Sequence, residues 1–114
     1  MTINEKKPRC FMLEPCAKVT DDLAEFGDIV FMFKRSDSRP SIFSERFQAL
    51  VEQRLRELEF DPEYDYFVMT GYMIGICVVV SVLSRMFVAF DTLIFHAPTS
   101  SYTEVTLGTE VPKL

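Results

Sequence analysis

Apolar residues form four short runs along this chain with the length and composition of β-strands. Residues 28–33, 64–69 and 90–97 are rich in β-branched and aromatic residues, and 28–33 is apolar on both faces, as in a covered central strand. Residues 102–107 alternate polar and apolar side chains, which is typical of an edge strand with one face in water.

Two longer segments between these runs have helical character. Residues 41–60 carry apolar side chains at helical spacing, with charged side chains elsewhere on the cylinder, and residues 72–87 have the length of a helix. The order β-α-β-α-β-β predicts an α/β fold in which three parallel strands are extended by a C-terminal antiparallel hairpin.

The same pattern predicts how the chain is divided. We expect one α/β domain at residues 28–107, because a chain of 114 residues fits a single domain. An irregular segment at 1–27, punctuated by prolines, should precede it, although residues 11–13 could pack as a short strand. Residues 108–114 should form a tail.

Nineteen consecutive residues without a charge separate Asp65 from Arg85. By length they fit a transmembrane helix, so a small single-span membrane protein is one interpretation. The pair Thr70-Gly71 divides the run at a strand-to-helix boundary, however, and a span would isolate the neighbouring helix and hairpin. We therefore favour a soluble βα unit.

The second predicted helix is apolar on all sides, and such a helix must be buried on all sides. A sheet covers only one face, so we expect a second copy of the chain or another protein to cover the rest. Alternatively, the first 27 residues fold over the helix. The predicted oligomer interface consists of Ile76, Val79, Val80 and Leu83.

Composition narrows the classes of partner. The chain is 48% hydrophobic with eleven Phe, which is more apolar surface than one small core accommodates and favours association. The net charge of -5 argues against nucleic acid as a partner. An odd set of cysteines (Cys10, Cys16 and Cys77) and a polar N-terminus predict free thiols in a cytoplasmic protein.

Candidate catalytic and metal-binding residues are few. His96 is the sole histidine, and no serine or cysteine motif places a nucleophile beside it. Asp61, Glu63 and Asp65 alternate, but they lack the glycine and the further acidic ligand of a calcium loop. We expect no enzymatic activity, no metal and no cofactor.

The predicted sheet nevertheless sorts charge between its two edges. The strand C-terminal ends, where ligands of parallel sheets usually bind, collect basic and hydroxyl groups. The candidate ligand-binding residues at these ends are Lys34, Arg35, Thr70, Gly71 and His96. The opposite edge collects the acids Asp28, Asp65 and Asp91. Both helix N-termini would point to the basic edge, which favours an anion such as a nucleotide phosphate.

One string also carries a family resemblance. Asp61-Pro-Glu-Tyr-Asp-Tyr-Phe-Val-Met-Thr-Gly71, an apolar helix, and the hairpin Thr92-Leu-Ile-Phe-His with Tyr102-Thr-Glu-Val together resemble small uncharacterised α/β proteins of bacteriophages. The likeness spans residues 28–107. The turn here reads Thr70-Gly71-Tyr72, where those proteins usually have Gly followed by an acid. The resemblance implies the fold and a viral origin, and carries no function.

These observations predict a non-enzymatic, homo-oligomeric binding or assembly protein that acts through protein–protein contacts. The alternative is a nucleotide- or phosphate-binding protein that uses the basic sheet edge, and the second alternative is the membrane protein.

Overall fold

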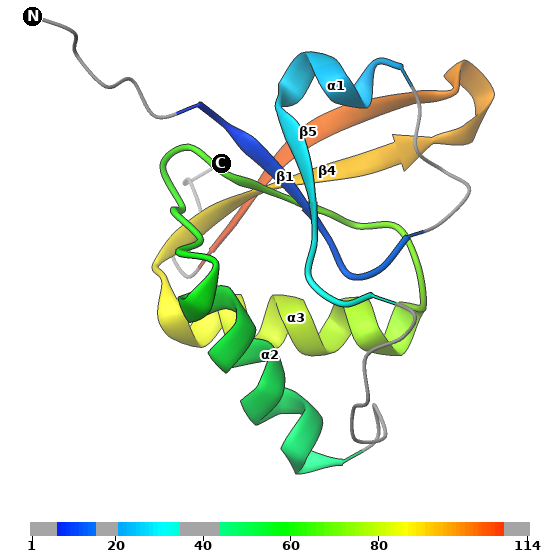
Figure 1. The fold of residues 1–114 in the computed structure, drawn as a ribbon. Helices are drawn as coiled ribbons and strands as arrows, with labels where there is room; N and C mark the ends of the chain where they lie inside the picture. The colour runs from blue at the N-terminus through cyan, green and yellow to red at the C-terminus, as the bar shows by residue number, and fades with distance from the viewer. Residues whose placement is uncertain (1–6, 16–20, 35–43, 109–114) are drawn as a thin grey trace, which may run out of the picture.

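The computed structural model, which describes residues 7–15, 21–34 and 44–108, has a five-stranded sheet with helices on either side (Figure 1). The elements follow in the order β1 (Arg9–Met12), α1 (Leu23–Phe26), β2 (Asp28–Phe31), α2 (Glu45–Glu57), β3 (Tyr66–Val68), α3 (Met73–Met86), β4 (Ala89–His96), the 3-10 turn η1 (Ala97–Thr99) and β5 (Ser101–Gly108).

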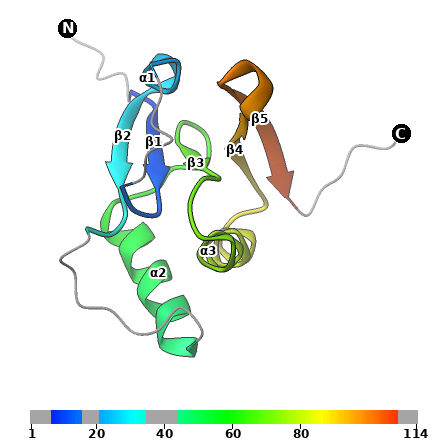
Figure 2. The ribbon, with the colours of Figure 1, turned by 90° about the vertical axis from the view of Figure 1, so that its right-hand side faces the viewer.

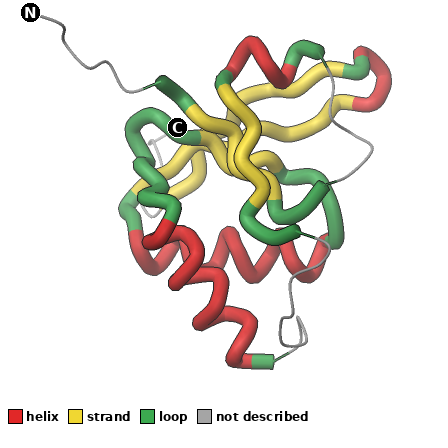
Figure 3. The backbone as a smooth tube through the Cα atoms, in the orientation of Figure 1, coloured by secondary structure: helices red, strands yellow, loops and turns green. Residues whose placement is uncertain are grey.

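The strands lie in the order β2-β1-β3-β4-β5. The first four are mutually parallel, and β5 runs antiparallel to β4. The predicted α/β class is therefore confirmed, including parallel strands extended by a C-terminal hairpin. Figure 3 shows the alternation of helix and strand that makes the parallel pairing possible.

Strand β1 lies within residues 1–27, for which the sequence predicts an irregular segment. It pairs with β2 on one side and with β3 on the other, and Cys10, Phe11 and Met12 are fully buried. The strand is only four residues long and lies between Pro8 and Pro15, so its local pattern is too short to predict a strand with these limits. The sheet begins at Arg9, and the predicted start of the domain at residue 28 is wrong.

Strand β2 is an edge strand, not the covered central strand that its apolar sequence predicted. Its side chains are only half-buried, and Phe31 is 39% exposed. The reason is that β1 lies between β2 and β3, so β2 has a neighbouring strand on one side only. Gly27 allows the two strands to meet, since a Cβ there would lie 2.7 Å from the carbonyl carbon of Pro8.

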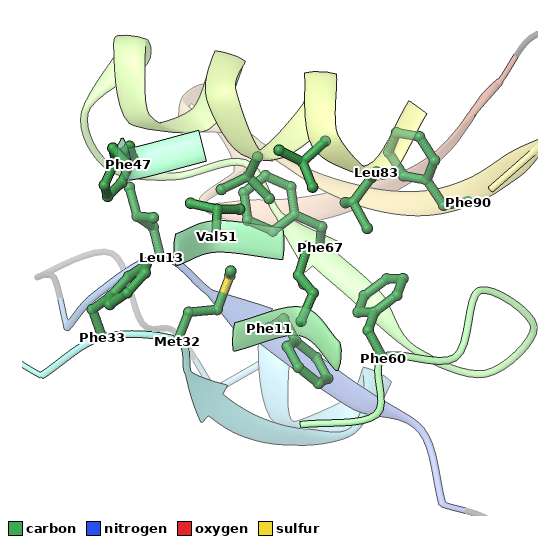
Figure 4. Close-up of a cluster of buried hydrophobic side chains, with 13 residues drawn as sticks. Phe11, Leu13, Met32, Phe33, Phe47, Val51, Phe60, Phe67, Leu83 and Phe90 are labelled. Atoms are coloured by element: carbon green, nitrogen blue, oxygen red, sulfur yellow. The ribbon is translucent and has the colours of Figure 1, made fainter. Parts of the chain in front are cut away.

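Helices α2 and α3 cover one face of the sheet, and the short α1 lies on the other side of the strands in both Figure 1 and Figure 2. The larger core lies between α2, α3 and the sheet and is rich in phenylalanine (Figure 4). Its buried side chains include Phe11, Leu13, Phe33, Phe47, Val51, Phe60, Phe67, Leu83 and Phe90.

The N-terminal segment also contributes to the cover of α3, as the alternative interpretation of the apolar helix allowed. Gly75 is buried in the first turn of α3, and a Cβ there would lie 2.5 Å from Cδ2 of Leu13. Among the described residues, no helix is long and apolar enough to cross a membrane.

Candidate functional site

A buried ion pair between Arg9 and Asp65 joins three elements at the N-terminal end of the sheet. Asp65 is fully buried, and its carboxylate accepts hydrogen bonds from Nη2 of Arg9 (2.9 Å), the Arg9 amide (3.2 Å) and the Asp61 amide (2.8 Å). The Arg9 guanidinium also donates to the carbonyls of Leu58 and Glu59 after α2, both at 2.8 Å. These bonds lie within the chain, so the pair has a structural role.

The alternating acids before β3 have local partners as well. Oδ1 of Asp61 accepts a hydrogen bond from the amide of Glu63 (3.0 Å), and Asp65 points inward to Arg9. Over the described part of the chain, no cluster of three or more His, Cys, Asp or Glu side chains could hold a metal ion.

The predicted anion-site residues lie at the C-terminal ends of the parallel strands. Lys34 follows β2, Thr70 and Gly71 follow β3, and His96 is the last residue of β4. Arg35 lies outside the described residues. The four described residues therefore share one sheet edge, as the sequence analysis expected.

The side chains at this edge nevertheless have partners in the hairpin. The Thr70 hydroxyl lies 3.1 Å from the Tyr102 hydroxyl in β5. Nδ1 of His96 lies 2.9 Å from Oγ1 of Thr99, which in turn lies 2.6 Å from Oγ of Ser101. Thr70 is thus bonded to β5, and His96 is bonded within the turn that follows β4.

Strand β1 separates Lys34 from Thr70. Two strand spacings of about 4.8 Å place the two backbones roughly 10 Å apart, and β1 leads into an acid at this edge, Glu14. Gly71 is open to solvent: it has φ +131° and no heavy atom within 4 Å of an added Cβ. Anion binding at this edge therefore stays a prediction, with Thr70 and the backbone after Gly71 as its best-placed groups.

The predicted oligomer interface on α3 needs correction. Val79 and Leu83 are fully buried in the chain's own core, so a second copy cannot contact them while the fold is intact. Ile76 and Val80 are partly buried against the same core. The cause is that an all-apolar sequence gives no information on which side of the helix faces the sheet.

The exposed apolar part of α3 lies at its N-terminal end. Tyr72, Met73 and Ile74 are consecutive, and their side chains are 65%, 79% and 46% exposed. We call these three residues the α3 tip. Ile94 in β4 is also exposed, at 39%.

Two clefts lie between α2 and α3, and neither is lined by a residue of the predicted ligand edge. The larger has a volume of about 420 Å³ and is lined by Glu45, Gln48, Ala49, Glu52 and Arg85. The smaller, of about 310 Å³, lies near the C-terminal ends of the same helices. The sequence predicts neither cleft, because the lining side chains come from two segments that are far apart in the chain and share no local motif.

The cysteines that the structure describes are free, as predicted for Cys10 and Cys77. Cys10 is buried in β1, with Sγ 3.8 Å from the carbonyl of Leu23. Burial, with smaller contributions from Asp28 and Asp65, raises the pKa of Cys10 to about 12. Cys77 is exposed on α3, and Cys16 lies outside the described residues.

Comparison with known families gives one match. A family model described as phage Pam3 gp32-like protein matches residues 12–109 of the chain. No curated protein and no solved structure matches the chain.

Proposed function

The chain belongs to the phage Pam3 gp32-like protein family, and we propose that it is a non-enzymatic, homo-oligomeric binding or assembly protein of the host cytoplasm. The proposal rests on the exposed apolar side chains of the α3 tip. Scattered exposed apolar side chains are normal, but three consecutive ones at 46% to 79% exposure concentrate apolar surface at one end of α3.

The polar groups of the described chain support a role in binding. Arg9 and Asp65 bond to each other and to backbone groups, and the hydroxyl of Thr70 bonds to Tyr102. Neither of these two contacts places a nucleophile beside a base, which is the arrangement that covalent catalysis needs. The Thr99 hydroxyl does lie 2.9 Å from Nδ1 of His96, but this contact is exposed in the turn after β4.

Sedimentation velocity of the full chain from about 1 to 100 μM tests the proposal. We expect an average mass above that of one chain, rising with concentration, because association follows mass action. A single-chain mass across the whole range contradicts the proposal.

A second candidate function is the binding of a small anion, such as a nucleotide phosphate, at the C-terminal edge of the sheet. Its support is the uncapped N-terminus of α3: Tyr72 makes no side-chain cap there, and the neighbouring Gly71 leaves the backbone open. Millimolar nucleotides and phosphate should raise the melting temperature of the protein, and Lys34→Ala should reduce that shift in a salt-dependent way. The absence of any shift removes this candidate.

A further inference from the structure

Strand β5 is the last strand of the sheet, and half of its backbone groups point away from β4. The amide of Met69 donates to the carbonyl of Leu93 (2.9 Å), so the backbone groups of Leu93 point to β3 and those of Thr92 and Ile94 point to β5. Because antiparallel pairs alternate, Val105 and Thr103 bond to β4, whereas Tyr102, Glu104 and Thr106 point outward.

The outward direction is confirmed at one end of the strand. The amide of Tyr102 donates to Oδ2 of Asp22 (2.8 Å), a residue far from it in sequence. The Asp22 carboxylate therefore occupies the outward-pointing amide at the start of β5. Within the described residues, no backbone group pairs with the outward N–H and C=O groups of Glu104 and Thr106. Figure 2 shows β5 as the outermost strand on the side away from α2.

The second half of this edge strand carries apolar side chains on the α3 side of the sheet. Val105 lies opposite Thr92, and Leu107 opposite Phe90, which belongs to the larger core. Val105 is only half-buried. Its side chain is therefore partly exposed to solvent unless another strand extends the sheet beyond β5.

We infer that a second copy of the chain pairs with this edge, β5 against β5 in antiparallel orientation, to form a two-fold dimer with one continuous ten-stranded sheet. The inference rests on the proposed self-association and names its surface. It replaces the α3 face expected from the sequence, because two of the four residues of that face are buried in the core.

Charge excludes one register of this pairing, and the apolar side chain of Val105 favours another. A two-fold axis at Glu104 would place two carboxylates directly opposite each other, which is destabilising. An axis at Val105 instead places Val105 against Val105 of the second copy on the α3 side. Glu104 then lies opposite Thr106, and the two residues exchange the outward hydrogen bonds. The edge is self-complementary in this register, and Asp22 limits pairing to the residues after Tyr102.

A disulfide trap tests both the surface and the register. In the full chain carrying Cys16→Ser and Cys77→Ser, Val105→Cys should give a disulfide-linked species of twice the chain mass after air oxidation. Directly opposite residues of an antiparallel pair have Cβ atoms about 4.5–5.5 Å apart, near the disulfide range. Glu104→Cys is the matched control, since its symmetry mate lies on the diagonal at about 7–8 Å and should cross-link far less.

A proline pair tests the hydrogen bonds without a new thiol. Thr106→Pro removes an outward N–H and leaves the backbone bonds to β4 in place, so the variant should fold and the dimer should be lost. It also loses the hydrogen bond from Oγ1 of Thr106 to Oδ1 of Asp91, which the valine control loses as well. Thr106→Val keeps the N–H and should keep the dimer. Far-ultraviolet circular dichroism establishes folding for both variants.

Two outcomes overturn the inference, and they differ in what else they overturn. If the unmodified chain has a single-chain mass, the proposed self-association fails together with the β5 pairing. If it is oligomeric but resists Thr106→Pro, and Val105→Cys cross-links no better than its control, only the β5 pairing fails. In that second case, loss of the oligomer in a Met73→Lys, Ile74→Lys double variant assigns the contact to the α3 tip.

Discussion

Removal of the Asp65 carboxylate is the sharpest test of how this fold is held together. In Asp65→Ala the Arg9 guanidinium, whose side chain is 25% exposed, keeps its charge but loses its counter-ion. The amides of Arg9 and Asp61 also lose their acceptor. The variant therefore leaves a partly buried cation without its counter-ion and two backbone donors without an acceptor at the junction of β1, α2 and β3. The guanidinium keeps its bonds to the carbonyls of Leu58 and Glu59.

The size of the effect follows from these contacts. Breaking a fully buried ion pair by removing one partner costs about 3–5 kcal/mol. The partial exposure of Arg9 places the expected loss near the lower limit, at about 3 kcal/mol. Domains of this size have a total stability of about 5–15 kcal/mol, and 1 kcal/mol corresponds to roughly 4 °C. We expect the melting temperature to fall by about 12 °C.

Urea unfolding followed by circular dichroism measures this loss, with Asp28→Ala as the control. Asp28 is an exposed acid at the same end of the sheet, and its removal should change stability by less than about 0.5 kcal/mol. The double variant Arg9→Met, Asp65→Leu carries no unpaired charge, so it should be less destabilised than the sum of its single variants. A loss below about 1 kcal/mol in Asp65→Ala, or strict additivity, would refute this reasoning.

Three further predictions concern packing and thiol chemistry. A thiol reagent at pH 8 should modify Cys77 quickly and Cys10 only after denaturation, since Cys10 is buried with a pKa of about 12; fast reaction of Cys10 contradicts its placement. Burial raises the pKa of Cys10 from 9.0, so the neutral thiol contributes fully to the free energy of unfolding below pH 9. This contribution should decrease as the pH rises towards 12, and Cys10→Ala should remove the decrease. Phe67→Ala should lower the free energy of unfolding by about 3–5 kcal/mol, because Phe67 is fully buried. Gly27→Ala should lower it by more than about 1 kcal/mol, because the added Cβ would clash with the Pro8 carbonyl. Near-native denaturation midpoints for these variants would contradict the packing of β1 against its neighbours.

Some of the candidate site could be read from the sequence. The sharing of one sheet edge by Lys34, Thr70 and His96 follows from parallel strands alone, and the structure has it. The bonds of Thr70 to Tyr102 and of Arg9 to Asp65 could not be predicted, because they join residues 32 and 56 positions apart. No local pattern records such a separation.

Local sequence patterns were sufficient to place the elements that are long or periodic. Helices α2 and α3, strand β4 and the hairpin to β5 lie within about four residues of their predicted limits, because local propensity and tertiary packing agree there. Strand β1 and the inward face of α3 depend instead on tertiary contacts. Four residues at Arg9–Met12 become a strand because β2 and β3 supply hydrogen bonds on both sides. Likewise, Val79 and Leu83 face inward on an all-apolar helix because the sheet and α2 occupy that side, which is information that hydrophobicity alone does not carry.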